Sequence, residues 1–226
     1  MEMNSRIPRD RHEKIDSSEV RYPTKYLVEK RVLDILFSAI ALLCLSPIFL
    51  IVFLLDCFGK NNRGPVFYKQ TRVGLHGKKF KMYKFRSMVV DAESILYNDS
   101  KLYSAYVKNN FKLEPKDDPR ITRMGAFLRK TSIDEIPQFI NIIKGDMSLI
   151  GPRPVVEEEL VEYDSDKLLS VKPGAMGLWQ ASGRSSVGYP KRAEIEMYYI
   201  DKACLKVDIK ILWKNIMKVF SQGGAY

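Results

Sequence analysis

The chain has 226 residues, of which 37 are Lys or Arg and 27 are Asp or Glu, so its formal net charge is +10. This length allows one domain with a core, or one domain with an appendage, and excludes two large domains. The three cysteines are widely spaced and there are only two histidines, which argues against a disulfide framework and a zinc site. The positive charge predicts an anionic partner, whether nucleic acid, anionic lipid or a phosphorylated small molecule.

The chain begins with a polar stretch of mixed charge, 1–24, which we interpret as a mobile tail. Next comes KRVLDILFSAIALLCLSPIFLIVFLLDCFGK, in which the 21 residues from Ile35 to Leu55 carry no charge. A spanning helix needs roughly 20 such residues, so 25–59 is predicted to be a membrane segment. The alternative is a helix buried in a soluble core, which a chain this small could hardly surround.

Ser46 and Pro47 lie in the middle of the membrane segment. Proline removes an intrahelical hydrogen bond and clashes with the carbonyl of Leu43, so we expect a kink there. The Ser46 hydroxyl can hydrogen-bond a carbonyl nearby. Basic residues flank the segment on both sides, whereas a helix that crosses the membrane normally has its Lys/Arg excess on one side. We therefore predict a re-entrant hairpin that returns to the cytoplasmic face, with a simple span as the alternative.

A strongly basic stretch follows, with nine Lys or Arg and no acidic residue from Lys60 to Val90. Alternation in PVFYKQTRVG and KKFKMYKFRS predicts a small basic β-hairpin that turns at His76 and Gly77. It could contact anionic headgroups, phosphate or nucleic acid, and its place beside a membrane argues against nucleic acid. Residues 91–111 have helical periodicity and predict one helix or a broken pair of helices.

The tract TSIDEIPQ, 131–138, places Asp134 beside Glu135 in an arginine-rich region. Ser132 and Glu135 also match an S-x-x-E capping box for a helix that ends at Lys144, and this structural alternative stays open. In either case the two carboxylates lie at or just before a helix N-terminus, where the dipole favours ionised carboxylates and attracts phosphate oxygens. An ionised carboxylate is a competent nucleophile, its neighbour can bind Mg²⁺ together with substrate phosphates, and arginines neutralise phosphoryl oxygens. These residues predict phosphoryl transfer.

An ordered set of motifs resembles the bacterial polyprenyl-phosphate sugar-1-phosphate transferases of the monotopic, single-domain class. The motifs are KRVLD, the central SP, KMYKFRSM, DDPRITRMGAFLRKTSIDEIPQ, NIIKGDMSLIGPRP, KPGAMGLWQASGR and DIKILWK. The resemblance implies transfer of a hexose 1-phosphate from a UDP-sugar to undecaprenyl phosphate, with release of UMP. The reaction would prime the assembly of exopolysaccharide, capsule or O-antigen. The implied location is the cytoplasmic face of the bacterial inner membrane, with the catalytic domain, 60–226, on the lipid surface.

The resemblance also implies roles for individual residues. Asp134 would be the nucleophile that forms a covalent phosphosugar intermediate, and Glu135 would bind the required Mg²⁺, with Asp134 as a second carboxylate at the metal. Arg153 corresponds to an arginine near the substrate phosphates. In the membrane segment, Ser46 and Pro47 correspond to the break in the family's re-entrant helix. Lys30 and Arg31 correspond to the basic pair at its start. Substrate contacts or electrostatic support are implied for Lys84, Arg86, Arg120, Arg129 and Arg184.

Several alternatives stay open at this point. GLWQASGR, 177–184, is similar to the form found in transferases for glucose or galactose, and a UDP-N-acetylated sugar is the alternative donor. A single direct displacement is the alternative mechanism. A non-catalytic membrane scaffold of the same fold, and a membrane-tethered nucleic-acid binder, are the alternative functions. The oligomeric state is open, a homodimer included.

The expected fold class is α+β and mostly helical, with the re-entrant membrane hairpin, the basic β-hairpin and amphipathic interfacial helices. Candidates for the interfacial helices are KRAEIEMYYI and VDIKILWKNIMKVF. In the second, a helical stripe lies beside lysines, and packing of this stripe on the protein's own core is the alternative. The stripe consists of Ile211, Leu212, Ile216, Val219 and Phe220.

If the membrane segment is re-entrant, Glu29 before it and Lys60 after it both face the cytoplasm. Topology reporters fused at either position should therefore report a cytoplasmic location. A reporter near Lys60 found on the far side of the membrane would contradict the re-entrant arrangement.

Overall fold

The computed structural model describes residues 22–58, 64–109, 113, 116–182 and 187–221. Most of the predicted tail, and Arg184, lie outside these residues. The elements run in chain order as α1 (Thr24–Phe58), β1 (Phe67–Val73), a 3-10 turn (Leu75–Gly77), β2 (Lys79–Phe85), α2 (Ala92–Asn98), α3 (Ser100–Lys108), α4 (Arg123–Lys130), a 3-10 turn (Ile133–Glu135), α5 (Gln138–Lys144), β3 (Ser148–Ile150), a 3-10 helix (Glu157–Glu162), α6 (Ser165–Leu169), β4 (Gly174–Met176), α7 (Leu178–Ser182), α8 (Lys191–Lys202) and α9 (Leu205–Ser221).

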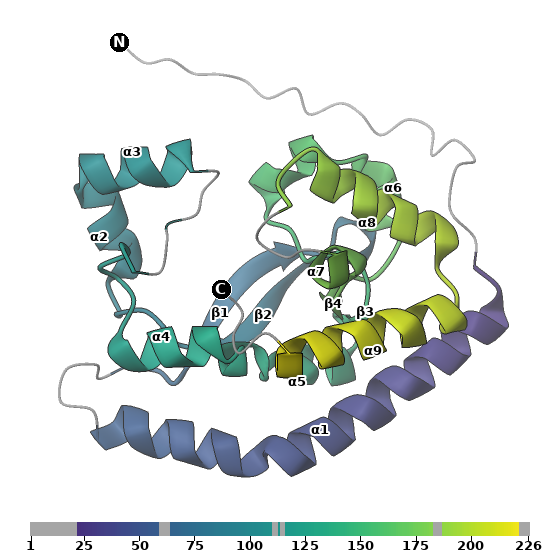
Figure 1. Cartoon of the computed structure of the whole chain (residues 1–226), viewed down its shortest axis with the longest axis horizontal. Helices are drawn as coiled ribbons and strands as arrows, with labels where there is room; N and C mark the ends of the chain where they lie inside the picture. The colour runs from purple at the N-terminus through teal and green to yellow at the C-terminus, as the bar shows by residue number, and fades with distance from the viewer. Residues whose placement is uncertain (1–21, 59–63, 110–112, 114–115, 183–186, 222–226) are drawn as a thin grey trace.

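Helix α1 is a continuous helix of 35 residues that runs along one side of the domain and bends near its middle (Figure 1). In the described part of the chain it is the one helix long and apolar enough to cross a membrane. Pro47 lies inside it, and the Ser46 hydroxyl donates to the Leu43 carbonyl at 2.7 Å. The predicted serine hydrogen bond is therefore confirmed, and the two arms beside the proline form one bent helix.

The first half of α1 docks on the domain through a line of polar side chains. The line takes every fourth residue of α1, and each of its members is buried or forms a hydrogen bond to the domain. The Lys30 ammonium donates to the Asp208 carboxylate of α9 at 2.6 Å and to the Ile150 carbonyl at 2.8 Å. The Asp34 carboxylate accepts from the Leu149 amide at 2.8 Å. The line consists of Tyr26, Lys30, Asp34 and Ser38.

Asp208 joins three helices at this docking site. Its carboxylate also accepts from the Tyr26 hydroxyl at 2.8 Å and from the Tyr199 hydroxyl of α8 at 2.7 Å. Because Asp208 is buried and every one of these donors is a side chain, the carboxylate ties α1, α8 and α9 together.

The second half of α1 packs against a separate apolar cluster. Val52 is buried with Phe85 of β2 and Leu128 of α4, and Ile133 and Ile136 pack against them. Both halves of α1 therefore contact the same domain.

The predicted basic hairpin is confirmed. Strands β1 and β2 are antiparallel, with Phe67 opposite Phe85 and Val73 opposite Lys79. The connecting turn places His76 at φ 54° and Gly77 at φ 75°, in the left-handed region that glycine adopts readily. Helices α2 and α3 confirm the broken pair predicted for 91–111.

The main core lies between β2, the short parallel pair β3–β4, and helices α5, α8 and α9. The parallel strands approach closely at two glycines, where a Cβ on Gly174 would lie 2.1 Å from the Gly151 nitrogen. The side chains that fill the core include Phe80, Met82, Ile142, Met147, Ile150, Ile200 and Ile211.

For the stripe predicted on α9, the alternative of packing on the core is confirmed at two positions. Ile211 is only 2% exposed and Leu212 packs on the core, so these two residues face inward. The side chains of Val219 and Phe220 lie outside the described part. The exposed apolar residues of α9 are Ile209, Trp213 and Met217.

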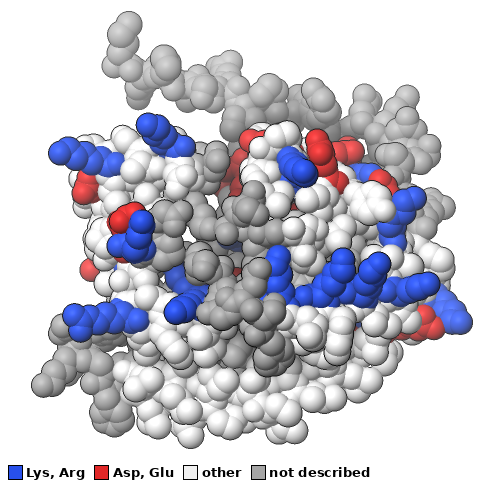
Figure 2. Space-filling model, in the orientation of Figure 1, with Lys and Arg blue, Asp and Glu red and all other residues white. Residues whose placement is uncertain are grey.

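The charge distribution follows the helices. Figure 2 shows a row of Lys and Arg side chains in the region of α9, above a broad surface without charged side chains in the region of α1. Exposed Lys206, Lys210 and Lys214 follow one another along α9 at every fourth position. Helix α8, the other predicted interfacial helix, lies above α9 in Figure 1, away from most of α1, and its last turn meets the start of the described chain where the Tyr22 hydroxyl donates to the Ile200 carbonyl at 2.6 Å.

The ion pair at Asp208 provides a test of how α1 is held. Asp208→Asn leaves the Lys30 ammonium partly buried without its carboxylate, so the free energy of unfolding should fall by about 3 kcal/mol. Thermal or denaturant unfolding of the full chain in detergent measures this loss. Asp201→Asn is the matched control, because Asp201 pairs with Lys167 at the surface and its loss should change stability by at most about 1 kcal/mol. Equal effects of the two variants would contradict the proposed anchoring role of Asp208.

Candidate active site

The Asp134–Glu135 pair lies in a 3-10 turn between α4 and α5. Ser132, just before it, has φ 57° and its side chain makes no capping hydrogen bond. The capping-box alternative is therefore wrong, because α5 begins only at Gln138, directly after Pro137. A non-glycine residue in the left-handed region stores backbone strain and often marks a functional site. The position of the two carboxylates just before a helix is confirmed.

Asp134 is buried, with 7% of its surface exposed. Burial and the neighbouring Glu135 raise the pKa of Asp134 to about 6, against the opposing effect of Lys84 and Arg129. A helix dipole is expected to lower the pKa of Asp134, and desolvation outweighs that effect. This pKa still lies below neutral pH, so the buried carboxylate is ionised in most molecules at pH 7.

Two basic side chains flank the pair. The Lys84 ammonium of β2 donates to the Glu135 carboxylate at 2.8 Å. The Arg129 guanidinium, in the last turn of α4, donates through Nε to the Ser87 hydroxyl at 2.8 Å. Lys84 of the basic hairpin and Arg129 of α4 therefore bring positive charge close to the dyad. This agrees with the electrostatic support implied for these two residues.

Arg86 and Arg120 hold the chain around the dyad. Arg86 Nε donates to the Pro65 carbonyl at 2.8 Å. Arg120 is buried and forms two side-chain hydrogen bonds to Asp118, each 2.8 Å long, and its guanidinium lies 5.7 Å from the Tyr106 ring centroid. These contacts support the dyad through the backbone, and contact of either arginine with a substrate stays a prediction.

Gly125 is a site residue that the sequence analysis missed. A Cβ at this position would lie 1.8 Å from the Ser87 carbonyl oxygen, so only glycine lets α4 pack on the end of β2. This close approach brings Arg129 to Ser87. A glycine inside a short helix is the signal in the sequence that could have indicated it.

Arg31 and Lys30 contact the protein itself. The Arg31 guanidinium donates to the Ile142 and Ile143 carbonyls at 2.6 and 2.7 Å. These carbonyls belong to the last turn of α5, where helix carbonyls lack intrahelical partners. The two residues implied as the basic start of the membrane helix thus fix α1 to the helix that follows the dyad and to β3.

Arg153 lies in a second charged cluster. Its guanidinium donates to both oxygens of Glu159, at 2.9 and 3.0 Å, and Arg72 reaches the same carboxylate at 3.4 Å. The Arg153 amide donates to Glu196 of α8 at 3.0 Å. No contact found in the described ranges joins Arg153 to the dyad.

The two clusters lie at opposite ends of one face of the hairpin. Lys84 lies opposite Tyr68, and Arg72 lies four residues further along β1 on the same face. Four residues of strand correspond to about 14 Å. An open groove of about 420 Å³ lies beside this stretch. Basic and acidic side chains both line it, among them Arg72, Lys79, Lys81, Glu93, Glu157 and Glu158. Its size is that of a small-molecule site.

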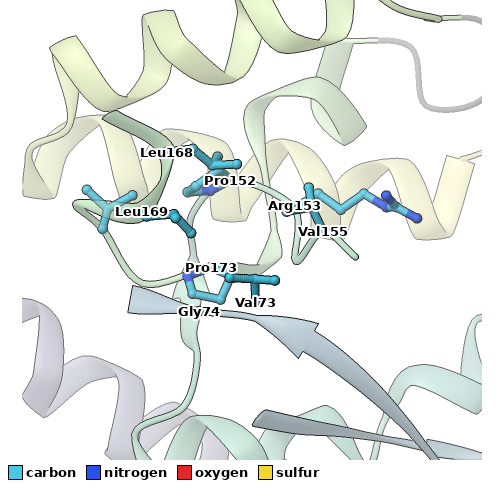
Figure 3. A pocket seen from close by; sticks show the side chains of 9 residues that line it. Val73, Gly74, Pro152, Arg153, Val155, Leu168, Leu169 and Pro173 are labelled. Carbon is cyan, nitrogen blue, oxygen red and sulfur yellow. The ribbon is translucent and has the colours of Figure 1, made fainter. Parts of the chain in front are cut away.

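A second, much smaller void lies behind the Gly-Pro-Arg-Pro turn. It measures about 10 Å³ and is lined by Pro152, Leu168 and Pro173 among others. Figure 3 shows the Arg153 guanidinium pointing away from it. The void is at the lower limit for a single water molecule, so it is a packing defect and not a ligand site.

The residues of the dyad fit a magnesium ion. No group of three or more His, Cys, Asp or Glu that could hold a metal occurs in the part of the chain that the structure describes. Two adjacent carboxylates suit Mg²⁺, which usually takes one or two protein carboxylates and completes its shell with waters and substrate phosphates.

Comparison with known proteins agrees with the geometry. The family model described as "Bacterial sugar transferase" matches residues 25–222. The chain is 45% identical over 202 residues to the "Undecaprenyl-phosphate galactose phosphotransferase" of Salmonella typhimurium, covering 87% of this chain and 41% of that protein. It is 42% identical over 202 residues to the "Exopolysaccharide production protein ExoY" of Sinorhizobium fredii, covering 88% of each.

A third relative is the "UDP-glucose:undecaprenyl-phosphate glucose-1-phosphate transferase" of Klebsiella pneumoniae. The chain is 36% identical to it over 210 residues, covering 88% of this chain and 42% of that protein. The chain thus spans less than half the length of the galactose and glucose enzymes, and most of the length of ExoY.

Glu196 provides a test of the second cluster through pH. Burial raises its pKa to about 7, against the lowering effects of the Arg153 amide and of the Arg192 charge. The folded state therefore binds more protons than the unfolded state, and stability falls as pH rises from about 4.5 to about 7, with a slope of up to about 1.4 kcal/mol per unit.

Glu196→Gln keeps an oxygen acceptor for the Arg153 amide and should remove this fall. Thermal unfolding of the full chain between pH 4.5 and pH 8 measures it. Glu194→Gln, at an exposed position of the same helix, is the control and should keep the wild-type pH dependence. An unchanged slope in Glu196→Gln would show that the carboxylate is not the titrating group.

Proposed function

Because the chain belongs to the bacterial sugar transferase family, we propose that it transfers a hexose 1-phosphate from a UDP-sugar to undecaprenyl phosphate and releases UMP. The observation that carries this proposal is the buried Asp134 carboxylate, mostly ionised at neutral pH, beside Glu135, Lys84 and Arg129. Two relatives are named for the transfer of galactose and of glucose, which favours a simple hexose over an N-acetylated sugar. The product would prime exopolysaccharide, capsule or O-antigen assembly.

The mechanism proceeds in two displacements. An oxygen of Asp134 attacks the sugar-bearing phosphorus of the donor, the bond from this phosphorus to the bridging oxygen breaks, and UMP leaves with that oxygen. A phosphate oxygen of the polyprenyl acceptor then attacks the same phosphorus, which frees the Asp134 carboxylate and forms the lipid diphosphosugar. Lys84 and Arg129 neutralise charge on the phosphoryl oxygens in both steps. A single direct displacement is the alternative.

Glu135 and Asp134 would hold the Mg²⁺. The ion supplies neutralising charge to the phosphate oxygens of the donor. Glu135 is the more accessible carboxylate, since about half of its side chain is exposed, whereas Asp134 is almost fully enclosed. This difference supports a role for Glu135 chiefly in metal binding and a role for Asp134 in nucleophilic attack.

The membrane arrangement supports the lipid acceptor. We place the exposed apolar face of α1, with Trp213 and its neighbours on α9, in one leaflet of the inner membrane at the cytoplasmic side. The lysines of α9 then lie at headgroup level. Since both halves of α1 contact one domain, a re-entrant path fits better than a span, with 25–59 as anchor and 60–226 as catalytic domain.

Incubation of the full chain with Mg²⁺ and a UDP-hexose labelled in the sugar tests the nucleophile. We expect a labelled phosphosugar adduct on Asp134 in the absence of lipid acceptor, and UMP release that falls at least about a thousandfold in Asp134→Asn. Asp166→Asn, at an exposed position, is the control and should keep wild-type activity.

Two results would change the proposal. Turnover without any adduct would favour the single displacement. If no UMP were released with any UDP-sugar and undecaprenyl phosphate, the scaffold would become the better function.

A further inference from the structure

Asn141 of α5 is a fully buried polar residue, with 0% of its surface exposed. A buried amide needs partners for its oxygen and for its two N–H groups. The Asn141 Oδ1 accepts from the Tyr83 amide at 2.9 Å, and the Nδ2 donates to the Lys81 carbonyl at 2.8 Å. The Nδ2 also donates to the Asp146 carboxylate at 3.2 Å. These three contacts fix the orientation of the amide.

The Asn141 amide closes the outer edge of β2. In an antiparallel pair of strands, alternate residues bond the partner strand. The Arg86 amide donates to the Val66 carbonyl at 2.9 Å, so the even-numbered residues of β2 bond β1. The backbone groups of Lys81 and Tyr83 therefore point away from β1, and Asn141 bonds them as a residue of a third strand would. Strand β2 is thus held by hydrogen bonds on both of its edges.

The same amide joins the strand that carries Lys84 to the helix that follows the dyad. Lys84 comes directly after Tyr83, and its ammonium donates to the Glu135 carboxylate at 2.8 Å. Glu135 lies six residues before Asn141, in the turn that leads into α5. Helix α5 lies between α1 and the basic hairpin (Figure 1), and Arg31 holds its last turn on α1. Helix α5 is therefore the fixed element against which β2 is placed.

Apolar packing holds β2 less precisely than these hydrogen bonds do. Phe80 and Met82 pack in the main core, and Phe85 packs in the cluster beside the second half of α1. Apolar packing has no preferred direction, whereas a hydrogen bond weakens steeply when its geometry changes. Without the Asn141 amide, β2 would stay folded and would shift on α5. A displacement of about 1 Å in an active site can lower a rate about a hundredfold.

We propose that Asn141 is a positioning residue for the transfer reaction, which holds the Lys84 ammonium at the Asp134–Glu135 pair by fixing β2 on α5. Among the described residues, the side-chain hydrogen bonds of Asn141 go to β2 and to Asp146 and not to the dyad. Asn141 therefore acts through Lys84. The inference rests on the proposed function, in which Lys84 neutralises charge on the phosphoryl oxygens.

A double-mutant cycle with Lys84 separates this role from a merely structural one. Asn141→Ala should lower the kcat for UMP release at least about tenfold and change the donor KM by less than about twofold, because the lost interaction acts in the transition state. In a Lys84→Met background, Asn141→Ala should change kcat by less than about twofold, because the side chain that Asn141 positions is already absent. Equal effects of Asn141→Ala in the two backgrounds would overturn the proposal.

Asn215→Ala is the matched control. Asn215 is the other buried asparagine among the described residues, and its amide donates to the Ile211 and Gly177 carbonyls at 3.0 and 3.3 Å. Its loss should lower the melting temperature about as much as the loss of Asn141 does. Any effect of Asn215→Ala on kcat should be the same with and without Lys84, because nothing in the described contacts of Asn215 leads to β2.

Amide hydrogen exchange tests the contact without turnover. The Tyr83 amide should exchange at least about tenfold faster in Asn141→Ala than in the wild type or in Asn215→Ala. The combined variant Asn141→Asp, Asp146→Asn keeps an acceptor for this amide and should keep its slow exchange. If Asn141→Ala does not fold, the combined variant provides the cycle with Lys84, because it loses the donor to the Lys81 carbonyl. Slow exchange of Tyr83 in Asn141→Ala would contradict the proposal.

The inference and the proposed function can fail separately. The unfolding free energies of Lys84→Met, Glu135→Gln and their double variant give the coupling between Lys84 and Glu135, which should be lost in an Asn141→Ala background. If that coupling were lost but the wild type released no UMP, the positioning role of Asn141 would be supported and the transferase proposal would fall. If the wild type turned over and Asn141→Ala acted equally in both Lys84 backgrounds, the positioning role would fall and the transferase would stand.

Discussion

The structure depends on one constraint, which is that the two buried charged side chains of α1 need partners in the domain. A helix this apolar carries Lys30 and Asp34 on the face that meets the domain, and neither charge is tolerated there alone. Asp208, the Leu149 amide and backbone carbonyls neutralise or satisfy them. The anchor is therefore bound to the domain by polar contacts along its first half and by apolar packing along its second half. Two different kinds of contact give α1 one fixed orientation against the domain.

The same arrangement also fixes the position of the dyad. Ile133 and Ile136 enclose the turn between them and pack with Val52 of α1, while Arg31 caps the far end of α5. The same packing that attaches the anchor also buries Asp134. Burial raises the pKa of that carboxylate, and Lys84 and Arg129 limit the rise. The proposed nucleophile, the proposed metal ligand and the long apolar helix α1 thus belong to one packed unit.

Much of this could be predicted from sequence because the signals are local. The alternation of apolar and polar residues predicts the β1–β2 hairpin, and Ser46 with Pro47 predicts the bend in α1. The place of Asp134 before a helix that ends at Lys144 followed from a few neighbouring residues. The capping box failed locally as well, because Pro137 delays the helix and Ser132 adopts a left-handed conformation that prevents capping.

What the sequence could not supply are contacts between distant segments. The carbonyl partners of Lys30 and Arg31 lie more than 100 residues away in sequence, so no local pattern could indicate them. Arg72, Arg192 and Glu196 each look like ordinary surface residues in sequence, and they become a cluster only when β1, α8 and the turn at Arg153 meet. The choice between an interfacial stripe and a core stripe on α9 stayed open for a related reason. Periodicity identifies two apolar faces on that helix but not which face the core covers.

The separation of Lys30 from Asp208 also bears on how the protein is made. The two residues are 178 positions apart, so the carboxylate that pairs with Lys30 is synthesised long after α1. Until then the Lys30 ammonium and the Asp34 carboxylate need water. Stable docking of α1 on the domain therefore has to wait for the synthesis and folding of α9.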